Sequence, residues 1–142
     1  MTARYTAYGW ARIVWLGFLF MAVAVGALRE GLVVQIVGPA AAHIIGTVLV
    51  VTIILAATWF FVRITAARCR GADFWRIGLL WTISTIGFEV VFFHFVVGRS
   101  WRELGAEYNL AAGRIWVLVP LATLIGPPLL FAILRPRERC GG

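Results

Sequence analysis

The chain has 142 residues, of which 62% are hydrophobic, and its mean hydropathy is +0.93. Soluble domains keep their apolar share near one half, so this composition excludes an ordinary soluble domain and predicts a single integral membrane domain over residues 1–142. The formal net charge of +7 does not predict nucleic-acid binding, because the arginines fall in short loops and tails and form no basic stripe.

Four apolar segments follow one another along the chain, at about residues 13–34, 39–62, 75–97 and 115–134. Each holds about 20 residues, which at about 1.5 Å per residue matches a hydrocarbon core about 30 Å thick. The sequence therefore predicts an all-α fold, a four-transmembrane-helix bundle with antiparallel, up-down connections. The alternative is that the first segment is a cleaved signal peptide ending at Val25-Gly26-Ala27, which would leave an odd number of spans.

The connection over residues 98–113 carries a helix signal of its own. Ser100 and Glu103 form an S-x-x-E capping box, in which each side chain bonds to the other residue's backbone. Apolar and aromatic residues then recur at helical spacing, at Trp101, Leu104, Gly105 and Tyr108. With Arg102, Glu103 and Glu107 turned away, we expect a short interfacial helix on the outer face before the fourth span.

Orientation follows from the arginines. One side carries Arg4, Arg12, Arg63, Arg68, Arg70, Arg76, Arg135, Arg137 and Arg139. The other side carries fewer arginines, which acidic residues offset. We therefore expect both termini in the cytoplasm and a multi-pass protein of the bacterial inner membrane, with reduced Cys69 and Cys140 on the cytoplasmic side. Tryptophans are expected at the inner interface (Trp10, Trp59, Trp75) and at the outer one (Trp101, Trp116).

Small residues and prolines indicate how the helices associate, since burial of apolar surface does not drive association in lipid. The second segment has Gly38, Ala42 and Gly46 on one face, and the first has Ala22 and Gly26 at the same spacing. These stripes predict a close approach of the first two helices. The fourth segment contains Pro120, Pro127 and Pro128, which predict a bent helix or, alternatively, a hinge.

Ionisable residues from all four segments are expected near a common depth toward the outer face. They are Arg29, Glu30, His43, Glu89, His94, Arg99 and Arg114, and we call them the polar layer. Arg29 and His94 lie about 24 and 25 Å from the inner interface, and Glu89 about 18 Å. Charges in hydrocarbon are costly, so the layer predicts either a ligand site or a lock between helices, and both can coexist. Expected ion pairs are Arg29 with Glu89, and Glu30 with Arg99 or Arg114.

His43 and His94 provide an alternative, because two opposed imidazoles at similar height could ligate haem b, or a metal together with Glu89. Glu89 and His94 are five residues apart, about 140° around a helix, so they do not share one face. The sequence contains no G-x-S-x-G, H-E-x-x-H or C-x-x-C motif, which favours a protein that is not an enzyme.

The inner half of the predicted bundle has threonines and a serine that can bond to their own helices, and no polar track that would suit transport. We therefore expect the outer-leaflet polar layer to bind a small polar or lipid ligand, or a partner subunit. The alternative is a haem-binding or other membrane-embedded redox enzyme using His43 and His94. Expected partners are the lipid bilayer and a homo-oligomer or larger membrane complex.

Several strings carry a family resemblance. They are Gly26-Ala27-Leu28-Arg29-Glu30-Gly31, Ala42-His43, Phe88-Glu89 with His94, Trp101, and Gly113-Arg114-Ile115-Trp116. Over residues 26–118 the chain resembles a family of small bacterial four-span integral membrane proteins of unassigned function, and this resemblance implies the fold without an activity. The size is also similar to the MAPEG group of membrane glutathione transferases, whose Arg/Asn/Glu motif on the second helix is missing here.

Overall fold

The computed structural model describes residues 2–134, and all its regular elements are helical. They are α1 (Thr2–Leu28), the π-helix η1 (Arg29–Val33), α2 (Val34–Val37), α3 (Pro39–Thr65), α4 (Gly71–Val90), the π-helix η2 (Val91–Val96), α5 (Trp101–Glu107), the 3₁₀-helix η3 (Leu110–Ala112) and α6 (Leu118–Leu134). The C-terminal arginines and Cys140, expected above to be cytoplasmic, lie outside the described residues, as does the side chain of Arg4.

Three helical stretches are long and apolar enough to cross a membrane, namely Tyr5–Val37, Pro39–Thr65 and Gly71–Val96, and α6 is a shorter apolar helix. The prediction of several apolar, membrane-type helices is therefore confirmed. The first helix is longer than its apolar segment, because residues 2–12 contain no helix breaker except Gly9 and continue the same helix. The last helix begins at Leu118 instead of residue 115, since Gly113 has a φ of +74° and a turn follows it.

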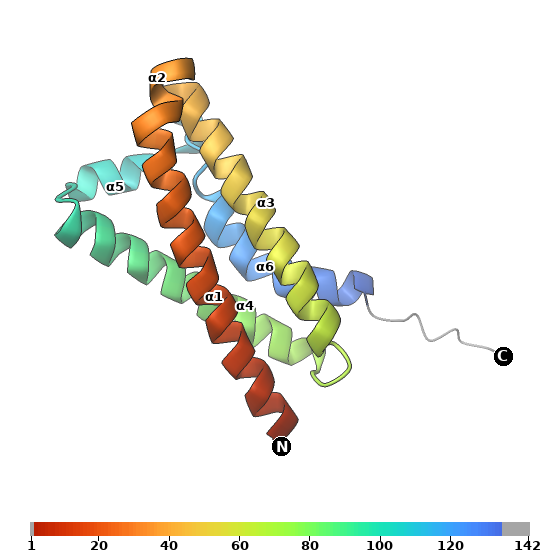
Figure 1. Ribbon diagram of the computed structural model, residues 1–142. Helices are drawn as coiled ribbons and strands as arrows, with labels where there is room; N and C mark the ends of the chain where they lie inside the picture. The colour runs from red at the N-terminus through yellow and green to blue at the C-terminus, as the bar shows by residue number, and fades with distance from the viewer. Residues whose placement is uncertain (1, 135–142) are drawn as a thin grey trace.

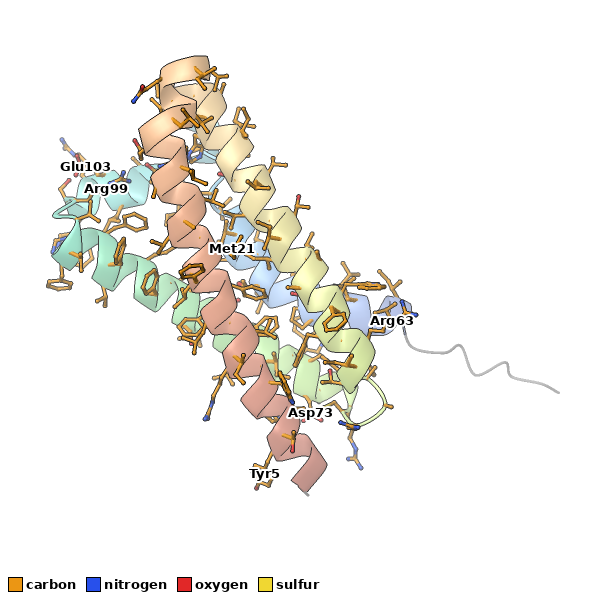
Figure 2. All side chains as sticks on the ribbon, viewed as in Figure 1. Tyr5, Met21, Arg63, Asp73, Arg99 and Glu103 are labelled. Atoms are coloured by element: carbon orange, nitrogen blue, oxygen red, sulfur yellow. The ribbon has the colours of Figure 1, made fainter. Side chains whose placement is uncertain are left out.

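The helices cross instead of running parallel (Figure 1). α1 passes obliquely in front of α4, and α6 packs against both α3 and α4. α2 and α5 lie at one end of the molecule, while the N-terminus and the turn between α3 and α4 lie at the other. Figure 2 places Arg99 and Glu103 at the first end, and Arg63 and Asp73 at the opposite end. The charged side chains labelled there thus fall at two ends, with apolar helix between them.

A chain of aromatic rings connects all four long helices in the core. The ring of Trp81 in α4 lies 5.0 Å from Phe18 of α1 and 5.5 Å from Phe61 of α3. Phe74, also in α4, lies 6.4 Å from Phe61 and stacks at 4.6 Å on Phe131 of α6. The Trp81 indole N–H donates to the Ala11 carbonyl of α1 at 2.9 Å. This hydrogen bond gives the buried indole donor a partner within the aromatic core.

The prolines of α6 create the closest approach between helices. Pro127 and Pro128 lack the N–H groups that would otherwise bond to the carbonyls of Thr123 and Leu124, four residues earlier. A Cβ built on Gly78 of α4 would lie 2.4 Å from the Leu124 oxygen and 3.2 Å from the Thr123 oxygen. The backbone of α4 therefore covers both freed carbonyls. Pro120 lies in the first turn of α6, where a missing N–H breaks no helical bond, so it is not an internal kink.

The small-residue stripe of the second helix makes a contact with a charged side chain. Ala42 and Gly46 are buried, and a Cβ on Gly46 would lie 3.2 Å from Cδ of Arg29. At Gly26 of α1, no described atom lies within 4 Å of such a Cβ. Only the small residue of α3 is therefore used in a close contact, and the space beside Gly46 is occupied by the aliphatic part of the Arg29 side chain.

Several threonines donate to carbonyls of their own helices, as the sequence predicts, whereas buried Thr85 of α4 accepts from the Trp15 indole of α1. Thr47 and Thr58 of α3 donate to the carbonyls of His43 and Ile54, at 2.8 and 2.6 Å. Thr82 of α4 additionally lies within 3.3 Å of the Pro120 carbonyl and 3.0 Å of the Thr123 hydroxyl. These threonines serve helix packing.

Helix α5 forms where the capping box predicts it. The Ser100 amide donates to Glu103 Oε2 at 2.7 Å, and the Glu103 amide donates to Ser100 Oγ at 3.3 Å. These hydrogen bonds stabilise the carboxylate and hold the pKa of Glu103 below its ordinary value. The helix is thereby fixed at its first turn, directly after the left-handed Gly98.

Candidate functional site

Two π-helical segments carry part of the polar layer. η1 contains Arg29 and Glu30, and η2 contains His94. A π-helical turn inserts an extra residue into an α-helix and changes which side chains face inward, and such turns are frequent at functional sites. Here both interrupt long apolar helices where these reach the layer. The hydropathy pattern does not mark them, because it follows polarity and not the local hydrogen-bond register.

Arg29 is at the centre of the layer. Its Nη2 donates to Glu30 Oε1 at 2.6 Å, and its Nη1 lies 3.4 Å from Nδ1 of His43. The Arg29 side chain is only 18% exposed, whereas that of Glu30 is 59% exposed. The expected ion pairs of Arg29 with Glu89, and of Glu30 with Arg99 or Arg114, are wrong, because the adjacent residues Arg29 and Glu30 pair with each other.

Glu107 of α5 joins three basic side chains of the layer. Its Oε1 lies 2.9 Å from Arg114 Nη1 and 3.5 Å from Arg99 Nη1, and its Oε2 lies 3.6 Å from His43 Nδ1. The sequence interpretation, which turned Glu107 away from the bundle, is wrong. Glu103, Ala106 and Glu107 line the space beside Arg29 and His43, whereas Trp101 is 61% exposed. The polar face of α5, and not its aromatic face, is therefore turned to the layer.

Glu89 is buried, with 7% of its surface exposed, and two donors hold it. The Tyr108 hydroxyl donates to Oε2, and the Trp116 indole donates to Oε1 at 2.8 Å. Trp116 was expected at the outer interface, but its indole instead donates a hydrogen bond to this buried carboxylate. Burial, together with the neighbouring Glu89 carboxylate, raises the pKa of Tyr108. The contacts tie the connection between α4 and α6 down onto α4.

His94 has a different set of partners. Its Nδ1 is 2.8 Å from the Arg99 carbonyl, and its ring stacks on Trp101 with centroids 4.0 Å apart. A carbonyl only accepts, so Nδ1 carries the proton. His94 thus fixes the turn between η2 and α5, whereas His43 contacts Arg29 and Glu107. Within residues 2–134, no group of three His, Cys, Asp or Glu side chains could hold a metal ion.

Three voids meet at the layer. A mostly apolar cavity of about 270 Å³, lined by α1, α3, α4 and η2, and a small void of about 60 Å³ under α5 both contact Glu89. A polar cavity of about 340 Å³ lies beside Glu30, His43, Glu107 and Arg114. Arg29 and Arg99 line all three. The two arginines therefore stand where apolar and polar space adjoin.

Two buried nitrogen atoms of the layer lack a hydrogen-bond partner among the described residues. They are Arg29 Nε and His43 Nε2. His43 Nδ1 lies 3.4 Å from the donor Arg29 Nη1 and 3.6 Å from the acceptor Glu107 Oε2, and when Nδ1 accepts from Arg29, Nε2 carries the proton. Both unpaired atoms are then donors. Buried donors are nearly always satisfied, which indicates a missing acceptor.

Comparisons of this chain with protein-family models, curated proteins and solved structures find no match. The resemblance to small bacterial four-span proteins therefore stays a prediction, and the function has to be argued from the site itself.

Of the predicted layer, the structure brings Arg29, Glu30, His43, Arg99 and Arg114 together around the polar cavity. Glu89 lies beside this group on the apolar side, and His94 serves the neighbouring turn. Sequence reasoning missed the roles of Glu107, Tyr108 and Trp116. It turned Glu107 away from the bundle, placed Tyr108 only on the pattern of the interfacial helix, and placed Trp116 only at the outer interface.

Proposed function

We propose that this chain is a four-span integral membrane protein that binds an acceptor-rich anionic group, a carboxylate or a phosphate, in its outer-leaflet polar layer. The observation that carries the proposal is the buried Arg29 Nε–H, which is always a donor, together with the unpaired His43 Nε2; neither atom has a partner within the described residues. An anionic oxygen would satisfy these donors and would form charge-assisted hydrogen bonds with them. The role is binding, without a reaction.

The count of donors around the polar cavity supports an anion. Arg29, Arg99 and Arg114 line it, and each guanidinium carries five N–H donors. Three carboxylates also line the cavity. Glu30 pairs with Arg29, Glu103 accepts from Ser100, and Glu107 is shared by three basic side chains. Donors therefore exceed acceptors, even though positive and negative charges nearly balance. A ligand with several oxygens would use the remaining donors, and planar guanidinium groups suit it by bidentate geometry.

The lock and the site then coexist in different residues of the layer. Glu89 has both oxygens occupied by Tyr108 and Trp116, which supports a structural lock at that position. Arg29 and His43 retain unused donors, which supports a site there. We therefore divide the polar layer into a structural lock at Glu89, on the apolar side, and a binding site at Arg29 and His43, on the polar side.

Binding of inorganic phosphate to the purified full chain, measured by calorimetry in a neutral detergent, tests the proposal. We expect Arg29→Gln to weaken binding roughly 10-fold or more, since hydrogen bonds to charged groups contribute about 1.5–3 kcal/mol. Arg102→Gln is the matched control, because Arg102 is exposed on α5 and does not line the polar cavity. Equal affinities in Arg29→Gln and wild type would refute the site.

The four-span topology in a bacterial inner membrane, with cytoplasmic termini, is part of the proposal. α6 has 17 residues, about 26 Å at 1.5 Å per residue, which is close to the hydrocarbon thickness of about 30 Å. In a background without native cysteines, we expect Arg102→Cys to react with an impermeant thiol reagent on intact cells. Arg68→Cys, in the turn between α3 and α4, should react only after permeabilisation. The reverse pattern would contradict the orientation.

A further inference from the structure

The apolar cavity is not needed by a small anion. It is lined mainly by hydrocarbon, including Phe18, Ala22, Val50, Phe88 and Val119, and its charged lining residues are Arg29, Glu30, Glu89 and Arg99. An empty apolar space forfeits dispersion contacts with its lining. An apolar occupant would restore these contacts. We therefore expect the ligand to have a hydrophobic part in this cavity, in addition to its anionic group.

We propose that the ligand is a single-chain anionic amphiphile. Its hydrocarbon chain lies in the apolar cavity, and its carboxylate or phosphate head lies against Arg29, where the apolar and polar cavities meet. This inference rests on the proposed function, which supplies the head-group site. Arg29, Glu30 and Arg99 line both cavities, so the two spaces adjoin at these side chains, and a head group at Arg29 lies beside a chain in the apolar cavity.

The size of the apolar cavity sets the number of chains. An apolar cavity of about 150 Å³ is known to hold a benzene ring. At 270 Å³ the present cavity has room for about ten carbons by the same measure. That accommodates one medium-length chain and not the two long chains of a diacyl phospholipid.

The apolar cavity opens sideways, where a membrane amphiphile would enter. Val23 of α1 and Val97 after η2 both line it, and they are 41% and 50% exposed. α1 and α4 separate beyond their crossing toward the end that carries α5 (Figure 1). The opening thus lies between α1 and η2 on an apolar, lipid-facing surface, and the chain of the ligand would stay in hydrocarbon throughout entry.

Gly26 offers a way to fill the cavity without disturbing the fold. It lines the apolar cavity, and a Cβ built there meets no neighbouring helix or side chain within 4 Å, so Gly26→Phe introduces its side chain at the cavity wall without a clash at Cβ. Gly17 is the matched control. It lies in the same helix, is exposed, has equally open surroundings and does not line the cavity.

The test compares equilibrium binding of dodecyl phosphate, dodecanol and inorganic phosphate to the full chain in phosphatidylcholine nanodiscs, with empty nanodiscs as background. We expect wild type and Gly17→Phe to bind dodecyl phosphate at least about tenfold more tightly than the other two probes. Gly26→Phe should lose this advantage and keep its phosphate affinity. Arg29→Gln should weaken binding of both phosphates.

The outcomes separate the two proposals. Equal affinity of wild type for dodecyl phosphate and inorganic phosphate, or unchanged dodecyl phosphate binding in Gly26→Phe, overturns the amphiphile inference and leaves the anion site standing. Dodecanol binding as tightly as dodecyl phosphate also overturns the inference, because the head group then contributes nothing. Unchanged binding of both phosphates in Arg29→Gln overturns the proposed function itself. Circular dichroism of each variant confirms that it is folded.

Discussion

Glu89 shows how a single buried residue organises this end of the molecule. Its two oxygens accept from Tyr108 and Trp116, which lie between α5 and the start of α6. A buried carboxylate that lost either donor would keep its desolvation cost without compensation. The residue therefore stabilises the fold by joining α4 to the connection that carries Glu107, and so it positions the site indirectly.

Removing one donor tests this role. We expect Trp116→Phe to destabilise the protein by about 1–3 kcal/mol, because Glu89 Oε1 loses its partner in a buried environment. Unfolding by sodium dodecyl sulfate in mixed micelles measures the change. Trp75→Phe is the control, since Trp75 is 56% exposed. Equal destabilisation of the two variants would show that the indole donor is not used.

Tyr108 gives a pH dependence with a defined sign. Burial and the Glu89 carboxylate raise the pKa of its hydroxyl above the ordinary value of 10.0. A group whose pKa is higher in the folded state stabilises fully below its unfolded pKa, and this contribution is lost as the pH rises through the folded pKa. Stability should therefore hold up to pH 10 and fall above it.

The near-ultraviolet absorbance of tyrosinate checks this directly. The difference between the titrations of wild type and Tyr108→Phe isolates the Tyr108 transition from those of Tyr5 and Tyr8. We expect that transition to coincide with unfolding above pH 10. A Tyr108 transition at the ordinary value, in folded protein, would contradict the contact with Glu89.

At the scale of helices, the α4–α6 contact depends on a carbonyl surface that prolines create. Pro127 and Pro128 free the Thr123 and Leu124 carbonyls, and Gly78 lets the α4 backbone approach them. Freed carbonyls within a membrane must be covered by protein. The proline pair and the glycine, which lie far apart in the sequence, therefore form one packing unit, and α4 is the helix against which the proline-containing α6 packs.

Alanine at Gly78 should break this unit. A Cβ there would lie 2.4 Å from a backbone oxygen, which cannot rotate away, so we expect a destabilisation of about 1–3 kcal/mol from overpacking. Gly87→Ala lies in the same helix, where no described atom comes within 4 Å of the new Cβ. It should be neutral or stabilising by up to about 1 kcal/mol. Thermal unfolding of both variants in one detergent distinguishes them.

At the scale of the whole molecule, the charges of the layer find partners within one chain. Glu107 contacts Arg99, Arg114 and His43, and Glu89 has its two donors. A second copy is thus not required to shield them. Homo-oligomerisation or docking on a larger complex stays a prediction, and it would bury exposed apolar surface such as Phe20, which is 75% exposed.

Native mass spectrometry in mild detergent, combined with hydrogen exchange, tests this separation of roles. We expect any oligomer to dissociate into folded monomers in which the Trp116 indole proton and the α5 amides keep their protection. Loss of that protection on dissociation would mean that the partner copy completes the layer, and the single-chain account of the charges would fail.

The sequence by itself determined what depends on local polarity and local backbone chemistry. Apolar runs predicted membrane-type helices, Ser100 and Glu103 predicted the start of α5, and the ionisable residues were expected at one depth, where most of them meet. Only the tertiary structure decided the partners, because an arginine can reach several acids and register alone does not choose among them. It decided that Arg29 pairs with Glu30, that Glu107 faces inward, and that apolar and polar cavities adjoin. The orientation of Glu107 and the adjoining cavities depend on contacts between residues far apart in the chain, whereas Arg29 pairs with its immediate neighbour Glu30 at a π-helical turn.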